Sequence, residues 1–318
     1  MKKVFTVVAV ILLAAGAAVF AYAFAAAGFD FSKLGTAKYE TNTYAADGKF
    51  ERIVIDAKES DVTLKPSADG KFSVVCFERE KMKHSASVED GTLRIGCDDR
   101  REWYDFLTFF RKTASMTVYL PAESYESLVI EGDTGSVDIP GDFSFGGIDV
   151  RVAVGRVFCG ASASGTIRLK TSTGDVRIGG VKAGEIELFA STGKIEASDV
   201  ECGTGFSAMV STGKITISDL SCKKLESKGS TGRITLENVT ASDAFDIERS
   251  TGDVRLDDCD ANEIRIVTST GGISGTLKTG KEFRTKTSTG RVVVPDSAEG
   301  GECVLTTSTG NIEISVKD

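Results

Sequence analysis

The stretch Ser211-Thr212-Gly213-Lys214-Ile215-Thr216-Ile217 decides the fold, because nearly the same pattern recurs from residue 134 to the C-terminus. A fixed period of this length is typical of solenoid proteins, in which each repeat packs only on its neighbours. The corner glycines that mark the copies lie 19 or 20 residues apart: Gly135, Gly155, Gly174, Gly193, Gly213, Gly232, Gly252, Gly271, Gly290 and Gly310.

Side chains at equal distances from these glycines are of the same type. Every residue two positions after the glycine is Val or Ile, and the residue seven positions before it is apolar in every copy. Apolar and polar residues alternate along each copy, which is the strand period, with a break at the glycine. Equivalent strands in successive turns are parallel, and such crossovers are nearly always right-handed. The sequence therefore predicts an all-β fold, a right-handed parallel β-helix (β-solenoid) of about ten turns.

The glycine itself suits a tight corner, because it accepts a positive φ without a Cβ clash. Thr precedes the glycine in nine of the ten copies, and Val154 does so in the other. This near-isosteric exchange predicts a column of methyl groups that points inward beside the corner.

The N-terminus is apolar. Lys2 and Lys3 precede an uncharged run over residues 4–29, which is long enough to span a bilayer, and the lysines would keep its start in the cytoplasm. We expect one transmembrane helix, with the rest of the chain outside a bacterial cell membrane. The alternative is a cleaved signal peptide, since small residues occupy 25–27.

A diverged first turn and an insertion precede the regular repeats. The segment 50–55 resembles 125–130, with Ser60 in place of the corner glycine, and we interpret it as a capping turn. The insertion over residues 65–120 predicts short strands at 72–77, 85–89, 92–97 and 116–120, the middle two joined at Asp90-Gly91.

Four parts of the chain follow from these patterns. They are an anchor or signal peptide over residues 1–29, a juxtamembrane linker over 30–49, the capping turn with inserted β-hairpins and an aromatic loop over 50–124, and β-helix repeats over 125–318. The last strand should leave an open edge at the far end, guarded only by Lys317 and Asp318.

An aromatic cluster in the insertion is one candidate interaction surface. Trp and Tyr favour membrane interfaces and protein contacts, so this loop either touches lipid headgroups or a partner, or plugs the end of the β-helix. Its residues are Trp103, Tyr104, Phe106, Phe109 and Phe110.

Three further residues depart from the repeat. Phe189 and Met209 occupy an outward position in adjacent turns and form either a small exposed apolar patch or the seat of a covering loop. Arg249 falls where other turns carry small residues, so its charge either points inward or emerges at the corner beside Glu248 or Asp253.

Composition limits the partners. The net charge of −8 argues against a nucleic-acid partner, which needs a basic face. The seven cysteines cannot all pair within one chain, and their positions favour buried small apolar residues. A disulfide between Cys202 and Cys222 stays open, because stacked neighbours lie within bridging distance.

No catalytic, cofactor-binding or metal-ligating residue is predicted. The only histidine, His84, lies in a charged segment and is expected at a solvated strand end, and no nucleophile elbow, phosphate loop or zinc spacing occurs. Asp175 and Asp253 follow their corner glycines, but Lys or Arg takes that position in other turns, so no calcium ladder forms.

The repeated Ser-Thr-Gly-x-Val/Ile-x-Val/Ile units behind an N-terminal anchor resemble the bacterial "putative adhesin" family of β-strand-repeat proteins over residues 50–318. The segments 31–36 and 103–105 resemble those of clostridial members. The resemblance implies an extracytoplasmic β-helix of unknown activity and supplies no functional residues.

Three functions follow as hypotheses. The first is a non-enzymatic module of the cell envelope that binds a glycan or a membrane protein. The second is a regulatory or sensing component of envelope stress, which would need a membrane partner because the cytoplasmic part is so short. The third, a carbohydrate-active enzyme, is disfavoured because no acid cluster can be placed. The sequence does not indicate which face binds, or the oligomeric state.

Overall fold

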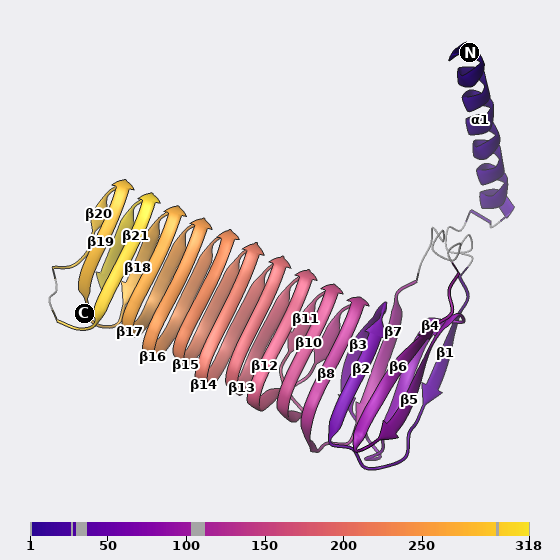
Figure 1. Cartoon of the computed structure of the whole chain (residues 1–318), viewed down its shortest axis with the longest axis horizontal. Coiled ribbons are helices and arrows are strands. Elements are labelled where there is room, and N and C mark those ends of the chain that lie inside the picture. Colours follow the sequence, from indigo (N-terminus) through magenta and orange to yellow (C-terminus); the bar gives the residue numbers. More distant parts are fainter. Residues whose placement is uncertain (1, 27, 30–36, 103–111, 297–298, 318) are drawn as a thin grey trace.

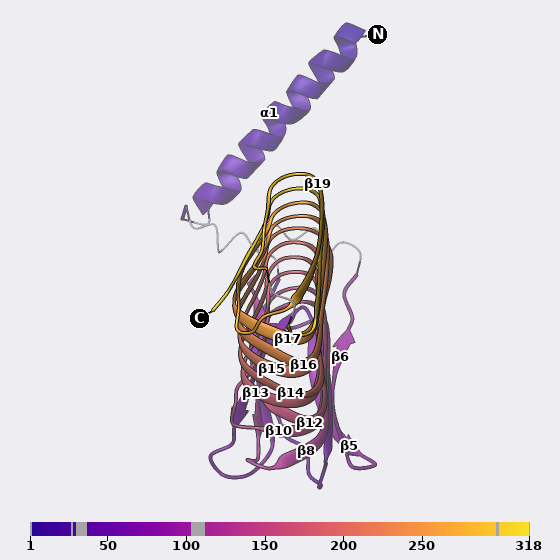
Figure 2. The same ribbon diagram turned by 90° about the vertical axis from the view of Figure 1, so that its left-hand side faces the viewer.

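The polypeptide is a parallel β-solenoid of about nine turns, preceded by one helix (Figures 1 and 2). The computed structural model describes residues 2–26, 28–29, 37–102, 112–296 and 299–317. The predicted β-solenoid is confirmed, with about nine turns where the sequence suggested ten.

Successive turns stack in register. Val176 is the Cα partner of Ile195, which in turn is the partner of Ile215, so the predicted columns of equivalent side chains exist. The strands of these turns are β8 (Ser124–Thr134), β9 (Val137–Ile139), β10 (Ser144–Val154), β11 (Val157–Cys159), β12 (Ser162–Thr173), β13 (Val176–Thr192), β14 (Ile195–Thr212), β15 (Ile215–Thr231), β16 (Ile234–Thr251), β17 (Val254–Thr270) and β18 (Ile273–Leu277).

The glycine corners bring neighbouring backbones very close together. The amide of Gly213 donates to the Thr231 carbonyl, and a Cβ on Gly213 would lie 1.6 Å from the carbonyl oxygen of Gly193. Its φ of +151° also disfavours other residues. Glycine is therefore required both by the backbone angle and by the contact between stacked corners.

The predicted inward threonine column is wrong. Thr192, Thr212 and Thr231 are exposed, because the chain has already begun to turn outward at the residue before the glycine. The inward column lies two residues earlier, where Thr171 is fully buried and its hydroxyl donates to the Gly155 carbonyl.

A second corner, which the sequence did not reveal, lies six residues after the glycine. Asp199, Asp219, Asn238 and Asp258 all adopt a left-handed conformation there, with φ between 51 and 53°. Asp and Asn tolerate this conformation because their short side chains hydrogen-bond locally. Asp or Asn therefore specifies this corner in most turns, and glycine takes the same position at Gly180, whose φ is 67°.

The far end of the solenoid is not stacked in chain order. The last two strands, β21 (Glu302–Thr309) and β22 (Ile312–Val316), lie between the turn of β17 and β18 on one side and that of β19 (Glu282–Thr289) and β20 (Val292–Val293) on the other. Cys303 accordingly pairs with both Ile264 and Phe283. The expected C-terminal edge is therefore covered, and β19 and β20 form the outermost turn (Figure 1).

The insertion builds the cap at the other end. Each strand of the first turn, β2 (Arg52–Lys58) and β3 (Ser60–Pro66), pairs with the next turn on one side. On the other side β2 pairs with the inserted strand β6 (Thr92–Asp99), and β3 pairs with β7 (Ala114–Leu120). The remaining cap strands are β1 (Tyr39–Tyr44), β4 (Ser73–Arg79) and β5 (Met82–Glu89). The four predicted short strands and the Asp90-Gly91 turn are all present.

Helix α1 (Lys2–Ala26) stands outside the solenoid, beyond the end that carries the cap (Figure 1). Within Lys3–Ala26 a window of 18 residues has a mean hydropathy of 2.7, and none of this window is buried against the rest of the chain. The helix is long and apolar enough to cross a bilayer, and a signal sequence would pass the same test.

Candidate functional site

The interior of the cap contains a cluster of polar and ionisable side chains, whereas the regular turns are filled mostly with apolar ones. Strand β4 points Val74, Cys76 and Glu78 inward by simple alternation, and the next strand, β5, points His84 inward. β4 pairs with β7 while β5 pairs with β6, so the hairpin of β4 and β5 joins the two sheets of the cap. The cluster therefore lies where the two sheets face each other.

Glu78 is the centre of this cluster. Its side chain is 1% exposed, and its carboxylate accepts hydrogen bonds from the Asn42 amide at 2.8 Å, from the Tyr44 hydroxyl and from the His84 backbone amide at 2.7 Å. Burial alone would raise the pKa of Glu78, but these hydrogen bonds together bring the pKa below its ordinary value. Glu78 is thus a buried carboxylate held in its ionised form.

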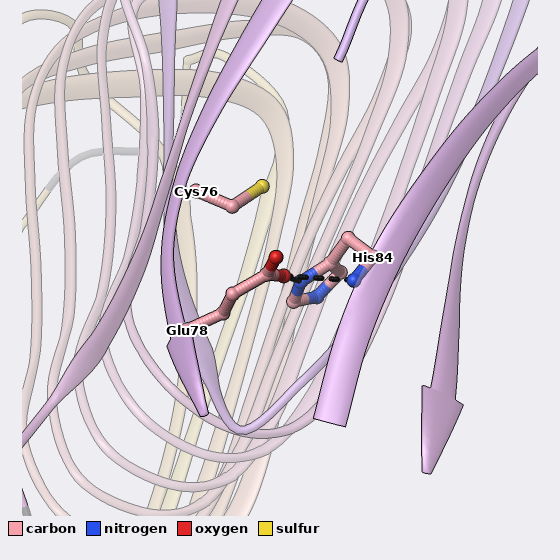
Figure 3. Close-up of side chains that lie close together, drawn as sticks. All are labelled: Cys76, Glu78 and His84. Atoms are coloured by element: carbon pink, nitrogen blue, oxygen red, sulfur yellow. Dashed lines mark hydrogen bonds and ion pairs between the residues drawn. The ribbon is translucent and has the colours of Figure 1, made fainter. Parts of the chain in front are cut away.

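His84 lies against Glu78, with 2.7 Å between Nδ1 and the Oε2 oxygen (Figure 3). Because an ionised carboxylate only accepts hydrogen bonds, Nδ1 carries the proton of this contact. The Nε2 atom is buried and has no hydrogen-bond partner among the described residues. The prediction of a solvated strand end is wrong, since His84 is 3% exposed. The alternation along β5, with charged residues on its outer side, keeps the ring inside.

Two thiols lie in the same interior. Cys76 is fully buried on β4, and Cys97 on β6 is the cross-strand partner of His84. Burial raises the pKa of each thiol to about 12, with the Glu78 charge adding to the effect, and a charge on Cys97 raises that of Cys76 further. Neither thiol is therefore an activated nucleophile.

The donor atoms of the cluster are close enough to share one ligand. One ligand atom each from Cys76, Glu78 and His84 lie within 4.8 Å of one another. Sequence reasoning missed the cluster because the three residues match no metal-binding spacing. The available signal was the alternation along β4, which places 76 and 78 on the face that also carries Val74.

The exposed face of the solenoid carries the second candidate site, which we call the Phe-Met patch and define as Phe189 and Met209. These residues are Cα partners on β13 and β14, and both are half-buried. Lys170 continues the column on one side, with its ammonium 5.1 Å from the Phe189 ring centroid, and Lys228 continues it on the other. The patch is thus a small apolar surface between two cations.

Arg249 does not belong to an exposed surface. Its side chain turns inward and is 3% exposed, so the alternative that it emerges beside Glu248 or Asp253 is wrong. Nη1 donates to the Val210 carbonyl at 3.0 Å, while Nε and Nη2 have no partner among the described residues. Burial lowers the pKa of the guanidinium to about 10. Gly229 in the neighbouring turn makes the space, since a Cβ there would lie 1.9 Å from Nη1.

Two further predictions concern the aromatic loop and the cysteines. The aromatic loop of Trp103, Tyr104, Phe106, Phe109 and Phe110 lies outside the described residues. All seven cysteines are free thiols, including Cys202 and Cys222, which are 5% and 6% exposed.

The aspartates that follow the corner glycines hydrogen-bond to the backbone of neighbouring turns. Asp175 accepts a hydrogen bond from the Lys194 amide, and Asp253 accepts one from the Gly272 amide in the neighbouring turn. Each therefore holds the amide of an adjacent corner.

The family model of Toastrack DUF4097 matches residues 50–212 and 204–318, which together include the capping turn and all the repeats. The chain belongs to the Toastrack DUF4097 family. No curated protein matches the sequence of the chain significantly.

Solved structures with a similar arrangement of strands come from Bacteroides and Parabacteroides species. A "putative adhesin" from Bacteroides fragilis is 14% identical, with 87% of this chain and 97% of that one covered and a TM-score of 0.39. "Putative adhesins" from Parabacteroides distasonis and Parabacteroides merdae are 13% and 11% identical, each with 88% of this chain and 98% of theirs covered, and TM-scores of 0.44 and 0.45. Because these sequence identities are low and the TM-scores lie below 0.5, the solved structures give no information about the function of this Toastrack DUF4097 protein.

Proposed function

We propose that this protein is a non-enzymatic, membrane-anchored module of the bacterial cell envelope that binds an acidic envelope glycan. The observation that carries the proposal is the Phe-Met patch between Lys170 and Lys228. An aromatic ring packs against the apolar face of a sugar, and the Lys170 ammonium beside it pairs with a carboxylate or phosphate of the glycan. Lys228 is already ion-paired with Glu226 at 2.6 Å and would exchange this partner for the glycan.

The solenoid provides a rigid and flat support for this patch. Neighbouring outward columns are already paired across turns, as in the salt bridges Arg168–Glu187 and Arg177–Glu196, both at 2.6 Å. Because the strands repeat at about 4.8 Å, the face matches an extended polymer better than a compact ligand.

The described residues favour binding over catalysis. The only histidine is enclosed in the cap, and the two cap cysteines have raised pKa values. Neither kind of group can act on a substrate at the surface without exposure of the core.

Binding of acidic wall polysaccharides by the purified full chain in detergent micelles tests the proposal. We expect Phe189→Ser combined with Met209→Ser to weaken binding at least tenfold, because the variant removes the apolar contact and keeps the charges. Phe158→Ser is the matched control, since Phe158 is 42% exposed on β11, on another side of the coil. Failure of the wild-type chain to bind any acidic glycan, or an equal loss in both variants, would overturn the proposal. Cross-linking from position 189 on intact cells that captures only a membrane protein would also overturn it, in favour of a sensing role.

Anchoring by α1 is a separate part of the proposal. We expect the mature protein to keep residues 2–26, to remain in the membrane after alkaline extraction, and to expose its solenoid to protease added outside. An N-terminal sequence that begins after residue 27 would show instead that the segment is a cleaved signal.

A further inference from the structure

We propose that the N-terminal cap is a binding site for a zinc-class metal ion, with Cys76, Cys97 and His84 Nε2 as ligands and Glu78 as the carboxylate that orients the His84 ring. This inference is independent of the glycan-binding function, since it concerns the interior of the cap and not the exposed face.

The donor set is the first argument. Zn²⁺ binds thiolate sulfur, imidazole nitrogen and carboxylate oxygen, and its structural sites are nearly always four-coordinate. With metal–ligand bonds of about 2.0–2.3 Å, neighbouring ligand atoms of a tetrahedral site lie roughly 3.3–3.7 Å apart. The Cys76 sulfur and a ring nitrogen of His84 lie within 4.8 Å of each other, and Cys97 is the cross-strand partner of His84, so small side-chain movements would bring these donors to the required separation.

The unpaired polar atom is the second argument. Buried polar groups are almost always hydrogen-bonded, and His84 Nε2 has no partner among the described residues although its ring is buried on all sides. A bound ion gives the imidazole the second partner that it lacks. Glu78 meanwhile fixes the ring through Nδ1, as carboxylates commonly do for the histidines of metal sites.

The buried carboxylate is the third argument. The hydrogen bonds that Glu78 accepts come from the side chains of Asn42 and Tyr44 and from the backbone and ring of His84. Cys76 lies on the same buried face of β4. A divalent cation in such a place stabilises a thiolate and displaces the thiol proton to solvent.

The position of the cluster indicates what the ion would do. Cys76 and Glu78 come from the sheet of β4 and β7, whereas His84 and Cys97 come from the sheet of β5 and β6. An ion held between them ties the two sheets together at the end of the solenoid that carries the cap, where the described residues stack no further turn (Figure 1). The ion would therefore be a structural metal that closes the cap.

Cobalt binding provides the test. The full chain in detergent micelles is reduced and titrated with Co²⁺, whose absorption reports thiolate ligands and tetrahedral geometry. We expect one Co²⁺ per chain, displaced by Zn²⁺. Cys76→Ser and His84→Gln should each weaken binding by at least 100-fold, and Glu78→Gln by roughly 10–100-fold. The matched control is Cys303→Ser, because Cys303 is an equally buried thiol in the solenoid.

Alkylation of the unmodified chain keeps the test independent of whether the variants fold. Zn²⁺ should slow the alkylation of Cys76 and Cys97 at least tenfold, measured peptide by peptide, while Cys159 and Cys303 react at unchanged rates. The proposal is overturned if the reduced, folded chain shows neither a cobalt spectrum nor protection. A disulfide between Cys76 and Cys97 in the protein isolated from cells would equally overturn it, because the thiols would then be consumed.

Discussion

The regular turns are stacked by parallel pairing alone, whereas the N-terminal cap adds antiparallel strands to the first turn, and the two regions also differ in what fills the interior. Ile195, Ile215 and Ile234 form one continuous apolar column, whereas the cap encloses Glu78 and His84. In the regular turns the same kind of side chain recurs at nearly every inward position of each repeat, with Arg249 as an exception. In the cap each inward residue occurs once, so its environment depends on pairings between distant strands.

The largest expected effect tests the regular turns. Gly213→Val should destroy the cooperative fold or cost about 4 kcal/mol or more, because its Cβ would meet the Gly193 carbonyl at 1.6 Å and its φ is +151°. Urea unfolding followed by circular dichroism measures the change.

Gly180→Asn is the control for that substitution. Gly180 has φ 67°, a Cβ placed on it would meet no atom within 4 Å, and Asn238 occupies the same position in another turn. We expect a change within about 0.5 kcal/mol. Equal stability of both variants would show that stacked corners do not require glycine.

The second prediction concerns the order of turns at the far end. Thr306 is the Cα partner of both Val267 and Lys286, so these two residues lie on either side of it. Val267→Cys with Thr306→Cys should form a disulfide almost completely on mild oxidation. Val267→Cys with Lys286→Cys should form none, because these residues lie two strand spacings apart, about 9.6 Å in total, which exceeds the reach of a disulfide. Mass spectrometry of the peptides decides, and the reverse result would show that the turns stack in chain order.

The third prediction tests the cap. Glu78→Ala should cost about 3–5 kcal/mol, because it leaves the buried His84 amide and the part-buried Tyr44 hydroxyl without their acceptor, while Asn42 keeps only its bond to Glu40. Glu80→Ala, on the exposed side of the same hairpin, is the matched control and should change stability by less than about 0.5 kcal/mol. Chemical unfolding of both variants gives the comparison. A small effect at Glu78 would mean that water reaches the cluster.

The difference between the repeated turns and the cap explains which parts of the structure could be predicted from the sequence. The period and the alternation specify the strands, the columns and the glycine corner, since each is repeated about ten times. They do not specify which turn lies next to which, because β19 and β21 carry equivalent patterns and either fits against β17. The cluster of Cys76, Glu78 and His84 was hidden for a related reason: it forms between two sheets whose pairing no local pattern encodes.

The smallest expected effect is at Arg249, a position where the regular turns resemble the cap in burying a charge. Arg249→Met keeps much of the side-chain volume beside Gly229 and removes a guanidinium that has one acceptor, the Val210 carbonyl, and two unpaired nitrogens among the described residues. Replacement of buried charged groups by apolar ones of similar volume is often neutral or stabilising, so we expect a gain of about 1 kcal/mol. Arg255→Met on the exposed face should change stability by less than about 0.5 kcal/mol. If Arg249→Met instead destabilised the protein by more than Arg255→Met, the guanidinium would be a necessary part of the core, and the distinction between an apolar stack and a polar cap would not hold.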